Sequence, residues 1–433
     1  MTPRSVLAVF VSVCFVGATS RAGDWPAWRG PAGTGLSAES GLPVKWSKSE
    51  NVRWRVALPD RGNSTPIVFG GHVFITQAIE KEGWRGLMCF RRGDGEKIWQ
   101  VGVTYTEKEM THGTNPYCSA SPVTDGERVI ASFGSAGLYC YDFAGKELWH
   151  RDLGKQEHIW GNAASPMLVG DLCVLNVGPG ERTFLIAVNK RTGETVWQHD
   201  EPGGKSGVEG NKDWLGSWTT PILIRVKADD GAERDELVMS FPTRACAFDP
   251  KTGRALWSCR GLGPLVYTSP LIGEADGKPV IVAMSGYGGP YLACRPGGSG
   301  DVTESHRLWQ VPRAPQRIGS GAIRGEHVYI LNDPGTFECI ELKTGKTVWA
   351  KRLEAPGGDH TSWSSMVLAG DKLFVVNHGG DSFVLRASPE FEQISTNSLG
   401  ERTLSSHGTS NGEIFIRTYK ALWCVREAGT GVR

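Results

Sequence analysis

A segment of about eleven residues recurs along the chain, and each copy ends in tryptophan. The copies read CFRRGDGEKIW at 89–99, AVNKRTGETVW at 187–197, AFDPKTGRALW at 247–257 and CIELKTGKTVW at 339–349, and CYDFAGKELW at 140–149 is one residue shorter. The terminal positions are Trp54, Trp99, Trp149, Trp197, Trp257, Trp309 and Trp349, with Phe391 as an aromatic substitute, at intervals of 40 to 60 residues. This regularity predicts one repeat architecture for nearly the whole chain.

Each repeat also opens in a similar way, with a hydroxylated residue before proline. The pairs are Thr65-Pro66, Ser121-Pro122, Ser165-Pro166, Thr220-Pro221 and Ser269-Pro270, and Ala322, Met366 and Ser410 take the proline position in the last three units. Between opening and tryptophan, the apolar runs have a period of two and are rich in Val, Ile and Phe, which indicates strands and excludes helical repeats. Proline is tolerated where an edge strand begins, and the Thr-Gly step suits a hairpin turn. Four short strands in such a unit are typical of a β-propeller blade, whose terminal tryptophan fills the space between neighbouring sheets.

The repeat count predicts an all-β fold, an eight-bladed β-propeller of four-stranded antiparallel blades. Seven units are complete or nearly so, whereas the last, from Ser406 to Val425, has only three strands. The segment Asn51–Val56 resembles the missing outer strand, so we expect the N-terminal strand to close the ring.

The first residues of the chain indicate its location, and its charge balance bears on its partners. Residues 1–22 combine Arg4, an apolar run and a small-residue cleavage site at Ser20 to Ala22, which predicts a secretory signal peptide. The remainder, 23–433, is expected to form a single propeller domain that is exported, either periplasmic or secreted, without a transmembrane segment. Lys+Arg 47 against Asp+Glu 46 gives no electrostatic reason for nucleic-acid binding. We expect a monomer.

The cysteines follow the repeat register. Cys89, Cys140 and Cys339 take the position that alanine fills in other copies, and Cys294 and Cys424 are interpreted in the same way. A cysteine in that position acts as a small apolar residue of a packed strand. The repeat register does not explain four other cysteines, and the sequence leaves undecided whether two of them form a disulfide. They are Cys118, Cys173, Cys246 and Cys259.

The ending A-x-D/N-x-x-T-G-x-x-x-W resembles the quinoprotein, or PQQ-like, propeller repeat, and the stretch WPAWRGPAGTG at 25–35 resembles the start of exported bacterial members of that family. The resemblance covers nearly all of the chain after residue 22. It implies one of two functions: a quinone-dependent dehydrogenase with PQQ and calcium, or a non-catalytic propeller of the BamB type. The alcohol dehydrogenases of the family typically carry two adjacent cysteines at the cofactor, and this chain has no such pair. The BamB-type lipoproteins carry a lipid-attachment motif, and Val13 before Cys14 does not suit one.

Residues just before the strand openings should line the mouth of the central channel. Tyr117, Trp160, Trp218, Tyr267 and Trp363 lie at these places, accompanied by His112, His158, His360 and His407. Second strands end in Asn176, Asn332 and Asn377, and Asp333 follows Asn332. An aromatic funnel with convergent amides suits a small polar ligand or a peptide loop. A channel plug with ordinary turn asparagines is the competing interpretation, and a turn-capping role competes with a base or calcium-ligand role for Asp333.

The sequence therefore favours a binding or scaffold propeller with a protein or polysaccharide partner in the cell envelope. No catalytic residue and no metal site are assigned, and no cofactor is expected. A PQQ- and calcium-dependent dehydrogenase acting on alcohols or sugars is one alternative, and a carbohydrate-binding propeller is another.

Overall fold

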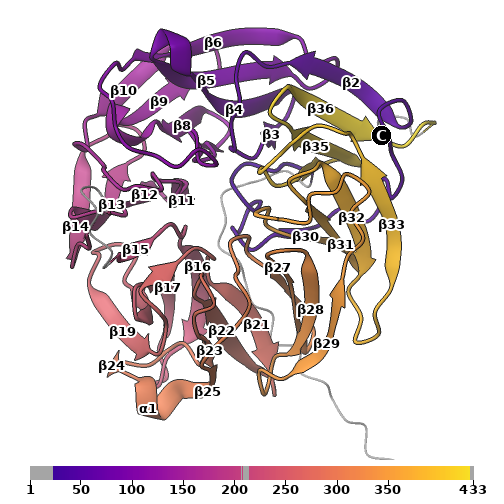
Figure 1. Ribbon diagram of the computed structural model, residues 1–433. Coiled ribbons are helices and arrows are strands. Elements are labelled where there is room, and N and C mark those ends of the chain that lie inside the picture. Colours follow the sequence, from indigo (N-terminus) through magenta and orange to yellow (C-terminus); the bar gives the residue numbers. More distant parts are fainter. Residues whose placement is uncertain (1–22, 206, 208–213, 430–433) are drawn as a thin grey trace, which may run out of the picture.

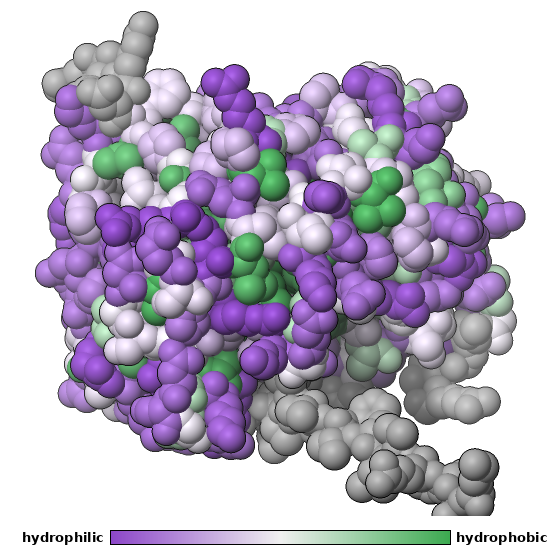
Figure 2. All heavy atoms as spheres, turned by 90° about the horizontal axis from the view of Figure 1, so that it is seen from below, coloured by the Kyte–Doolittle hydropathy of each residue, from purple (hydrophilic) through white to green (hydrophobic). Residues whose placement is uncertain are grey.

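The computed structural model describes residues 23–205, 207 and 214–429, and the described part consists almost wholly of β-strands. The strands form eight antiparallel blades around a central axis, as the repeat predicted (Figure 1). The apolar cores lie mostly between neighbouring blades, so each blade depends on the next for burial. Figure 2 shows the outer side of the ring, seen from below the view of Figure 1. This surface is mostly hydrophilic, with hydrophobic residues exposed in places. The predicted signal peptide, 1–22, lies outside the described residues.

The first four blades follow one another along the chain, each running from an inner strand to an outer one. They are β3 (Ile67–Phe69), β4 (His72–Ile79), β5 (Trp84–Arg91) and β6 (Lys97–Thr104); β7 (Val123–Thr124), β8 (Arg128–Ser132), β9 (Leu138–Asp142) and β10 (Glu147–Arg151); β11 (Met167–Val169), β12 (Leu172–Val177), β13 (Thr183–Asn189) and β14 (Thr195–Glu201); and β16 (Ile222–Lys227), β17 (Glu233–Phe241), β18 (Arg244–Phe248) and β19 (Ala255–Arg260).

The last four blades repeat this order, except that the final outer strand comes from the N-terminal part of the chain. They are β21 (Leu271–Ala275), β22 (Lys278–Met284), β23 (Tyr291–Cys294) and β25 (Arg307–Val311); β26 (Ala322–Arg324), β27 (His327–Asn332), β28 (Thr336–Glu341) and β29 (Thr347–Arg352); β30 (Val367–Ala369), β31 (Lys372–Val376), β32 (Asp381–Arg386) and β33 (Gln393–Ser398); and β34 (Gly408–Ser410), β35 (Glu413–Arg417), β36 (Ala421–Arg426) and β2 (Val52–Ala57).

Five short elements lie outside these blades. They are β1 (Leu36–Ser37), β15 (Gly216–Ser217), β20 (Leu265–Val266), β24 (Gly300–Asp301) and the helix α1 (Thr303–His306), and two 3-10 turns occupy Glu80–Glu82 and Gly134–Ala136. β24 pairs in parallel with β19, so this short strand covers the outer edge of the fourth blade.

The N-terminal strand closes the ring, as predicted. β2 pairs antiparallel with β36, and Trp54 lies opposite Cys424. The carboxylate of Glu413, almost fully buried, contacts Arg53 of β2 and accepts a 2.7 Å hydrogen bond from Nε of Arg92 in the first blade. Ion pairs thus join the last blade, the N-terminal strand and the first blade at one point.

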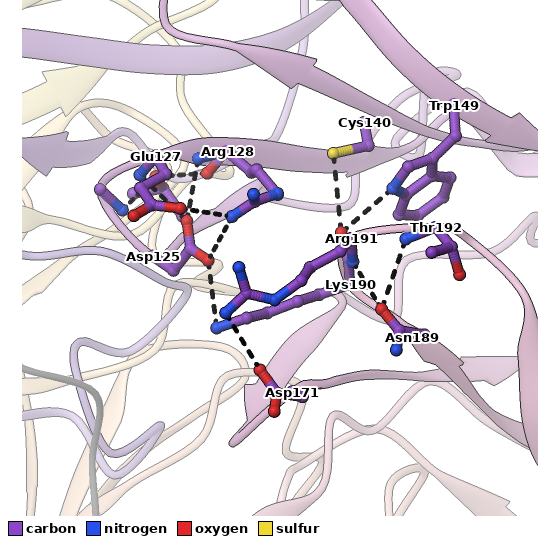
Figure 3. A network of polar contacts seen from close by, with 12 residues as sticks. Asp125, Glu127, Arg128, Cys140, Trp149, Asp171, Asn189, Lys190, Arg191 and Thr192 are labelled. Carbon is purple, nitrogen blue, oxygen red and sulfur yellow. Dashed lines mark hydrogen bonds and ion pairs between the residues drawn. The ribbon is translucent and has the colours of Figure 1, made fainter.

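The repeated tryptophans dock each blade onto the next. At the junction of the second and third blades, the Trp149 indole N–H donates to the carbonyl of Lys190 at 3.0 Å (Figure 3). The Lys190 ammonium in turn lies 3.1 Å from the Asp125 carboxylate of the second blade (Figure 3). Gly193 of the third-blade turn has a φ of 75°, and a Cβ there would lie 2.7 Å from the Trp149 ring. The glycine of the Thr-Gly turn therefore serves both the left-handed backbone and the close approach of the indole.

The register corrects two details of the sequence interpretation. Cys89, Cys140, Cys339 and Cys424 lie opposite a tryptophan, but in the fifth blade Ala293 takes that place and Cys294 is one residue further on. Phe391 does not replace the terminal tryptophan. The residue in that register is Ser395, and Phe391 lies in the preceding turn, where its ring contacts Trp349 at 5.2 Å. All nine cysteines of the described part are buried free thiols.

A belt of hydroxyl groups surrounds the channel, one from each blade. Each hydroxyl oxygen accepts a hydrogen bond from the backbone N–H of the equivalent residue in the preceding blade. The belt residues are Thr65, Ser121, Ser165, Thr220, Ser269, Ser320, Ser365 and Ser406, and the donor–acceptor distances are 2.8 to 3.3 Å. These are the hydroxylated residues that open the repeats. The residues after them in the sixth and eighth units are Gly321 and His407, not the predicted Ala322 and Ser410.

The segment before β2 crosses one end of the channel. Trp25 exchanges two backbone hydrogen bonds of 2.8 Å with Val68 of the first blade. The buried guanidinium of Arg29 donates to the carbonyl of Gly321, which precedes the sixth blade, at 2.7 Å. β1 then pairs in parallel with β30 of the seventh blade. Because these contacts lie on several blades around the axis, residues 25–37 obstruct the channel.

Candidate binding cup

The unobstructed end of the channel opens into a cavity of about 240 Å³, which we call the cup. Belt residues from six blades line the cup, and so does Trp28 of the N-terminal segment that obstructs the channel. The cup is therefore a dead-ended recess and not a pore.

Aromatic side chains form one side of the cup. Trp160, Trp218, Tyr267 and Tyr287 line it and contact one another, with ring centroids 5.0 to 6.2 Å apart. Trp160 and Tyr287 are stacked in parallel, 5.3 Å apart with an interplanar angle of 3°. Trp160, Trp218 and Tyr267 come from the connections before the third, fourth and fifth blades. Tyr287 comes from the loop between β22 and β23 of the fifth blade. They provide a broad apolar surface with polar tips.

A pair of short strands fixes two of these rings. β15 and β20 pair in parallel, and Trp218 and Tyr267 are the residues that follow them. The Trp218 backbone N–H donates to the Val266 carbonyl at 3.0 Å, and its indole N–H donates to the Gly161 carbonyl at 2.8 Å. Rings held at the backbone and at the indole lose little freedom when a ligand binds.

Tyr287 has an unusual backbone conformation. Its φ is 51°, in the left-handed region that bulky side chains rarely adopt. The loop around it is pinned by the Gly286 N–H, which donates to the Leu265 carbonyl at 2.9 Å. A Cβ on Gly286 would lie 2.0 Å from the Tyr267 ring, so only glycine fits there. Yet the Tyr287 side chain is 59% exposed, so burial of the ring does not account for this conformation. Such strain often occurs at ligand sites.

The cup combines polar groups with apolar surface. Among its described lining residues there is no Asp, Glu, Lys or Arg. The side-chain amide oxygen of Asn63 and the Tyr267 hydroxyl are buried and have no hydrogen-bond partner in the described part. Burial raises the pKa of Tyr267, so its hydroxyl stays protonated at neutral pH and can donate. The cup thus suits a neutral group that carries a few hydrogen-bonding atoms.

Of the residues predicted for the funnel, the cup brings together Trp160, Trp218, Tyr267, Trp363 and His112. Tyr117 lies elsewhere: its ring covers the Arg85 guanidinium at 3.9 Å and its hydroxyl donates to the Glu109 carbonyl. His407 is buried between blades, 3.1 Å from the Ser382 hydroxyl, and burial lowers its pKa to about 4.

The three predicted asparagines are buried and hold loops. Asn176 donates to the carbonyls of Ser217 and Thr219, on either side of Trp218, at 3.1 and 3.2 Å. Asn332 accepts from Arg317, and Asn377 accepts from the backbone of Asp381.

Asp333 is half-buried beside Trp363, where its backbone N–H donates to the carbonyl of the cup residue Gln316 at 2.8 Å. Burial raises the pKa of the Asp333 carboxyl. None of these four residues is among those that line the cup.

Sequence reasoning missed Trp28, Tyr287 and the belt hydroxyls. A signal for Tyr287 exists in the glycine-rich stretch Ser285 to Gly289, and the belt is marked by the hydroxylated residue of each opening. Trp28 has no local signal, because its place depends on long-range pairing of the N-terminal segment.

The residues of the cup do not fit PQQ with calcium. The quinone carries three carboxylates, which need cationic partners, and calcium needs oxygen ligands that include carboxylates. The described lining offers neither, and no group of three or more His, Cys, Asp or Glu side chains in the described chain has metal-binding geometry.

The fold, the repeat register and the dead-ended cup together define an eight-bladed propeller of PQQ-like repeats. A family model described as "Outer membrane protein assembly factor BamB" matches residues 85–351. The chain belongs to this family of propellers.

Individual relatives agree with this assignment. The chain is 24% identical to the outer membrane protein assembly factor BamB of Shewanella oneidensis over 311 residues, 67% of this chain and 69% of the relative. The solved structure of BamB from Moraxella catarrhalis has a TM-score of 0.58 at 14% identity, covering 88% of this chain and 98% of that one. A europium-containing methanol dehydrogenase has a TM-score of 0.67 at 13% identity, covering 93% and 91%. The two structural likenesses show a shared fold. In the described residues, no helix has the length and apolar character needed to cross a membrane.

Proposed function

We propose that this protein is an exported, non-catalytic binding module that holds a protein partner of the cell envelope at the cup. The observation that carries the proposal is the dead-ended cup with a fixed aromatic wall and no Asp, Glu, Lys or Arg among its described lining residues. Such a recess suits binding of a neutral group, and its described lining brings no carboxylate and no amine to the surface for acid–base or nucleophilic chemistry.

The size of the cup supports a protruding side chain as its occupant. Pockets for cofactors and drug-sized ligands usually measure about 300–1,000 Å³, whereas the cup measures about 240 Å³. An apolar or aromatic side chain at the tip of a partner loop would fill this space and stack on Trp160 and Trp218. Asn63 Oδ1 and Tyr267 Oη, which have no hydrogen-bond partner among the described residues, would bind the backbone of that loop.

The relatives supply the class of partner. The curated relative from Shewanella oneidensis is named as an outer membrane protein assembly factor. This kinship supports a location in the cell envelope and a protein partner.

A capture experiment tests the proposal. Tagged protein without residues 1–22 is incubated with envelope extract, alongside the variants Trp218→Ala, Trp363→Ala and, as a control, Leu148→Ala, which removes an exposed side chain from an outer strand. We expect one partner to be retained by the wild type and the control and lost from both tryptophan variants. Equal capture by all four proteins would overturn the proposal.

Titrations of the same proteins with PQQ plus calcium, and with neutral sugars, distinguish the alternatives. Tryptophan fluorescence reports occupation of the cup, and dye-linked oxidation reports turnover. Saturable quenching by PQQ with turnover would replace the proposal with a dehydrogenase, and quenching by a sugar without protein capture would replace it with a carbohydrate-binding function.

A further inference from the structure

The outer strands of five blades expose an aliphatic side chain at the same place, directly before the docking tryptophan. These residues are Ile98, Leu148, Val196, Leu308 and Val348, and they are 40 to 49% exposed. Hydrophobic residues are visible among the hydrophilic side chains of the outer wall (Figure 2). An outer strand is an unpaired sheet edge, which can pair with another chain, and an exposed apolar side chain on it adds a contact for that chain.

In the fourth blade, the chain itself covers the equivalent residue. Leu256 precedes Trp257 but is only 7% exposed, and it belongs to the same apolar cluster as Val302. The covering segment adds a strand to the edge: β24 pairs in parallel with β19, and the Val302 N–H donates to the Ser258 carbonyl at 2.9 Å. The Arg260 guanidinium donates to the Asp301 carboxylate at 2.5 Å, which fixes the register of the added strand.

The seventh blade is covered in a related way. The side chains of Ser395 and Asn397 on β33 both donate to the Val44 carbonyl. The Trp46 N–H donates to the Asn397 amide oxygen at 2.9 Å, and Ile394 packs against the same apolar cluster as Val44. The fold thus covers two of its outer strands with segments from elsewhere in the chain that carry a valine.

One uncovered edge repeats the recognition elements of the fourth blade. In β19, Leu256 precedes the tryptophan and Arg260 follows it by three positions; in β29, Val348 and Arg352 occupy the same places. The other four exposed edges have Gly102, Asp152, Asp200 and Pro312 at the arginine position. Lys351 and Arg352 are exposed, and neither has an ion pair in the described part of the chain. β29 therefore exposes an apolar side chain together with positive charge that no carboxylate of the described chain neutralises.

We propose that β29 of the sixth blade is a docking edge for an extended segment of a protein partner that carries an acidic residue followed by a β-branched aliphatic residue. The segment adds a strand to the edge, as Asp301 and Val302 do on the fourth blade. Its carboxylate pairs with Arg352, its aliphatic side chain covers Val348, and backbone hydrogen bonds supply the rest of the affinity. This surface is on the outer wall, and the proposal does not depend on the function of the cup.

A peptide copying 299–304, Ser-Gly-Asp-Val-Thr-Glu, is the probe. The fluorescein-labelled peptide is titrated with protein lacking residues 1–22, up to about 1 mM, and followed by anisotropy. We expect saturable binding that Arg352→Glu weakens by about tenfold or more and that a peptide with Lys in place of Asp restores on that variant. Val348→Lys should abolish binding. Val196→Lys is the matched control, because β14 has Asp200 where β29 has Arg352, and it should bind as the wild type does.

Several outcomes would overturn the proposal. They are absence of saturable binding to folded wild type, equal loss in the Val196→Lys and Val348→Lys variants, and failure of the charge swap to restore affinity. Light scattering on the same samples tests a second copy as the occupant. A concentration-dependent dimer that Val348→Lys abolishes would assign the edge to self-association. Thermal unfolding of each variant confirms that these surface substitutions leave the fold intact.

Discussion

The backbone N–H of Ser406, in the last blade, donates a 3.3 Å hydrogen bond to Oγ1 of Thr65, in the first. The same contact occurs between all other neighbouring blades, so the belt is a closed ring of eight hydrogen bonds with no free end. Each hydroxyl accepts from one blade while its own backbone N–H donates to the next. The belt therefore sets the spacing of all eight inner strands and the width of the cup.

Thr65→Ala should lower the free energy of unfolding by about 1–3 kcal/mol, because the buried Ser406 N–H loses its acceptor. Thr65→Ser is the control, since serine holds the equivalent position in six blades, and it should stay near the wild type. Denaturant unfolding measures both. A Thr65→Ala protein as stable as Thr65→Ser would show that the belt does not stabilise the seam.

Glu413→Gln should destabilise the ring closure strongly. The Glu413 carboxylate is almost fully buried and contacts Arg53 and Arg92, so neutralising it leaves two guanidinium groups without their counterion. The expected loss is about 3–5 kcal/mol. Glu392→Gln breaks an exposed ion pair with Arg386 and should cost less than about 1 kcal/mol. Similar losses in the two variants, measured by denaturant unfolding, would contradict this assignment.

Stability should fall as the pH decreases from about 6.5 to about 4. Burial lowers the pKa values of His158, His378 and His407 to about 4 in the folded protein, whereas the ordinary value is 6.5. Between these values the unfolded chain binds protons that the folded chain does not, so acid favours unfolding. His407→Gln should make the pH dependence of the unfolding free energy shallower across this window. An unchanged slope would exclude a contribution from His407.

The thiols should be unreactive until the protein unfolds. All nine described cysteines are buried, and burial raises the pKa values of Cys89 and Cys118 to about 12, so little thiolate forms at neutral pH. A thiol-specific chromogenic reagent should therefore label the native protein negligibly and label these cysteines in denaturant. Rapid labelling of native protein would show local opening of a blade. No labelling in denaturant without reductant would indicate disulfides.

The blade fold could be predicted because its contacts repeat in one register. Trp149 docks on the turn of the next blade, and the Thr-Gly turn that receives it is visible in the sequence. In the seventh blade, whose turn departs from this pattern, the predicted position of the terminal aromatic residue was wrong. The seventh blade lacks the Thr-Gly step, so Phe391 was aligned with the tryptophans although it lies in the turn that receives Trp349.

The aromatic part of the cup could be predicted for a similar reason. Trp218 and Trp363 stand before inner strands, and all inner strands begin at the same end of the ring. The asparagines could not be assigned in this way, because the direction of a side chain in a loop depends on its partners. Asn176 turns inward to hold the loop that carries Trp218. The position of Trp28 depends on contacts of Trp25 and Arg29 with distant blades, and no local periodicity encodes them.

β2 pairs with β36, which brings position 54 beside position 424. A strand that is synthesised early therefore finds its place in the sheet only at the end of folding. The strand that closes the ring emerges among the first residues and must wait, unpaired, until the final blade has been made. During that interval the molecule has two open edges, and local contacts cannot remove either one. Completion of the fold is therefore a single late event in which both ends of the chain take part. A chain interrupted before the last blade would keep its N-terminal strand available for incorrect pairing.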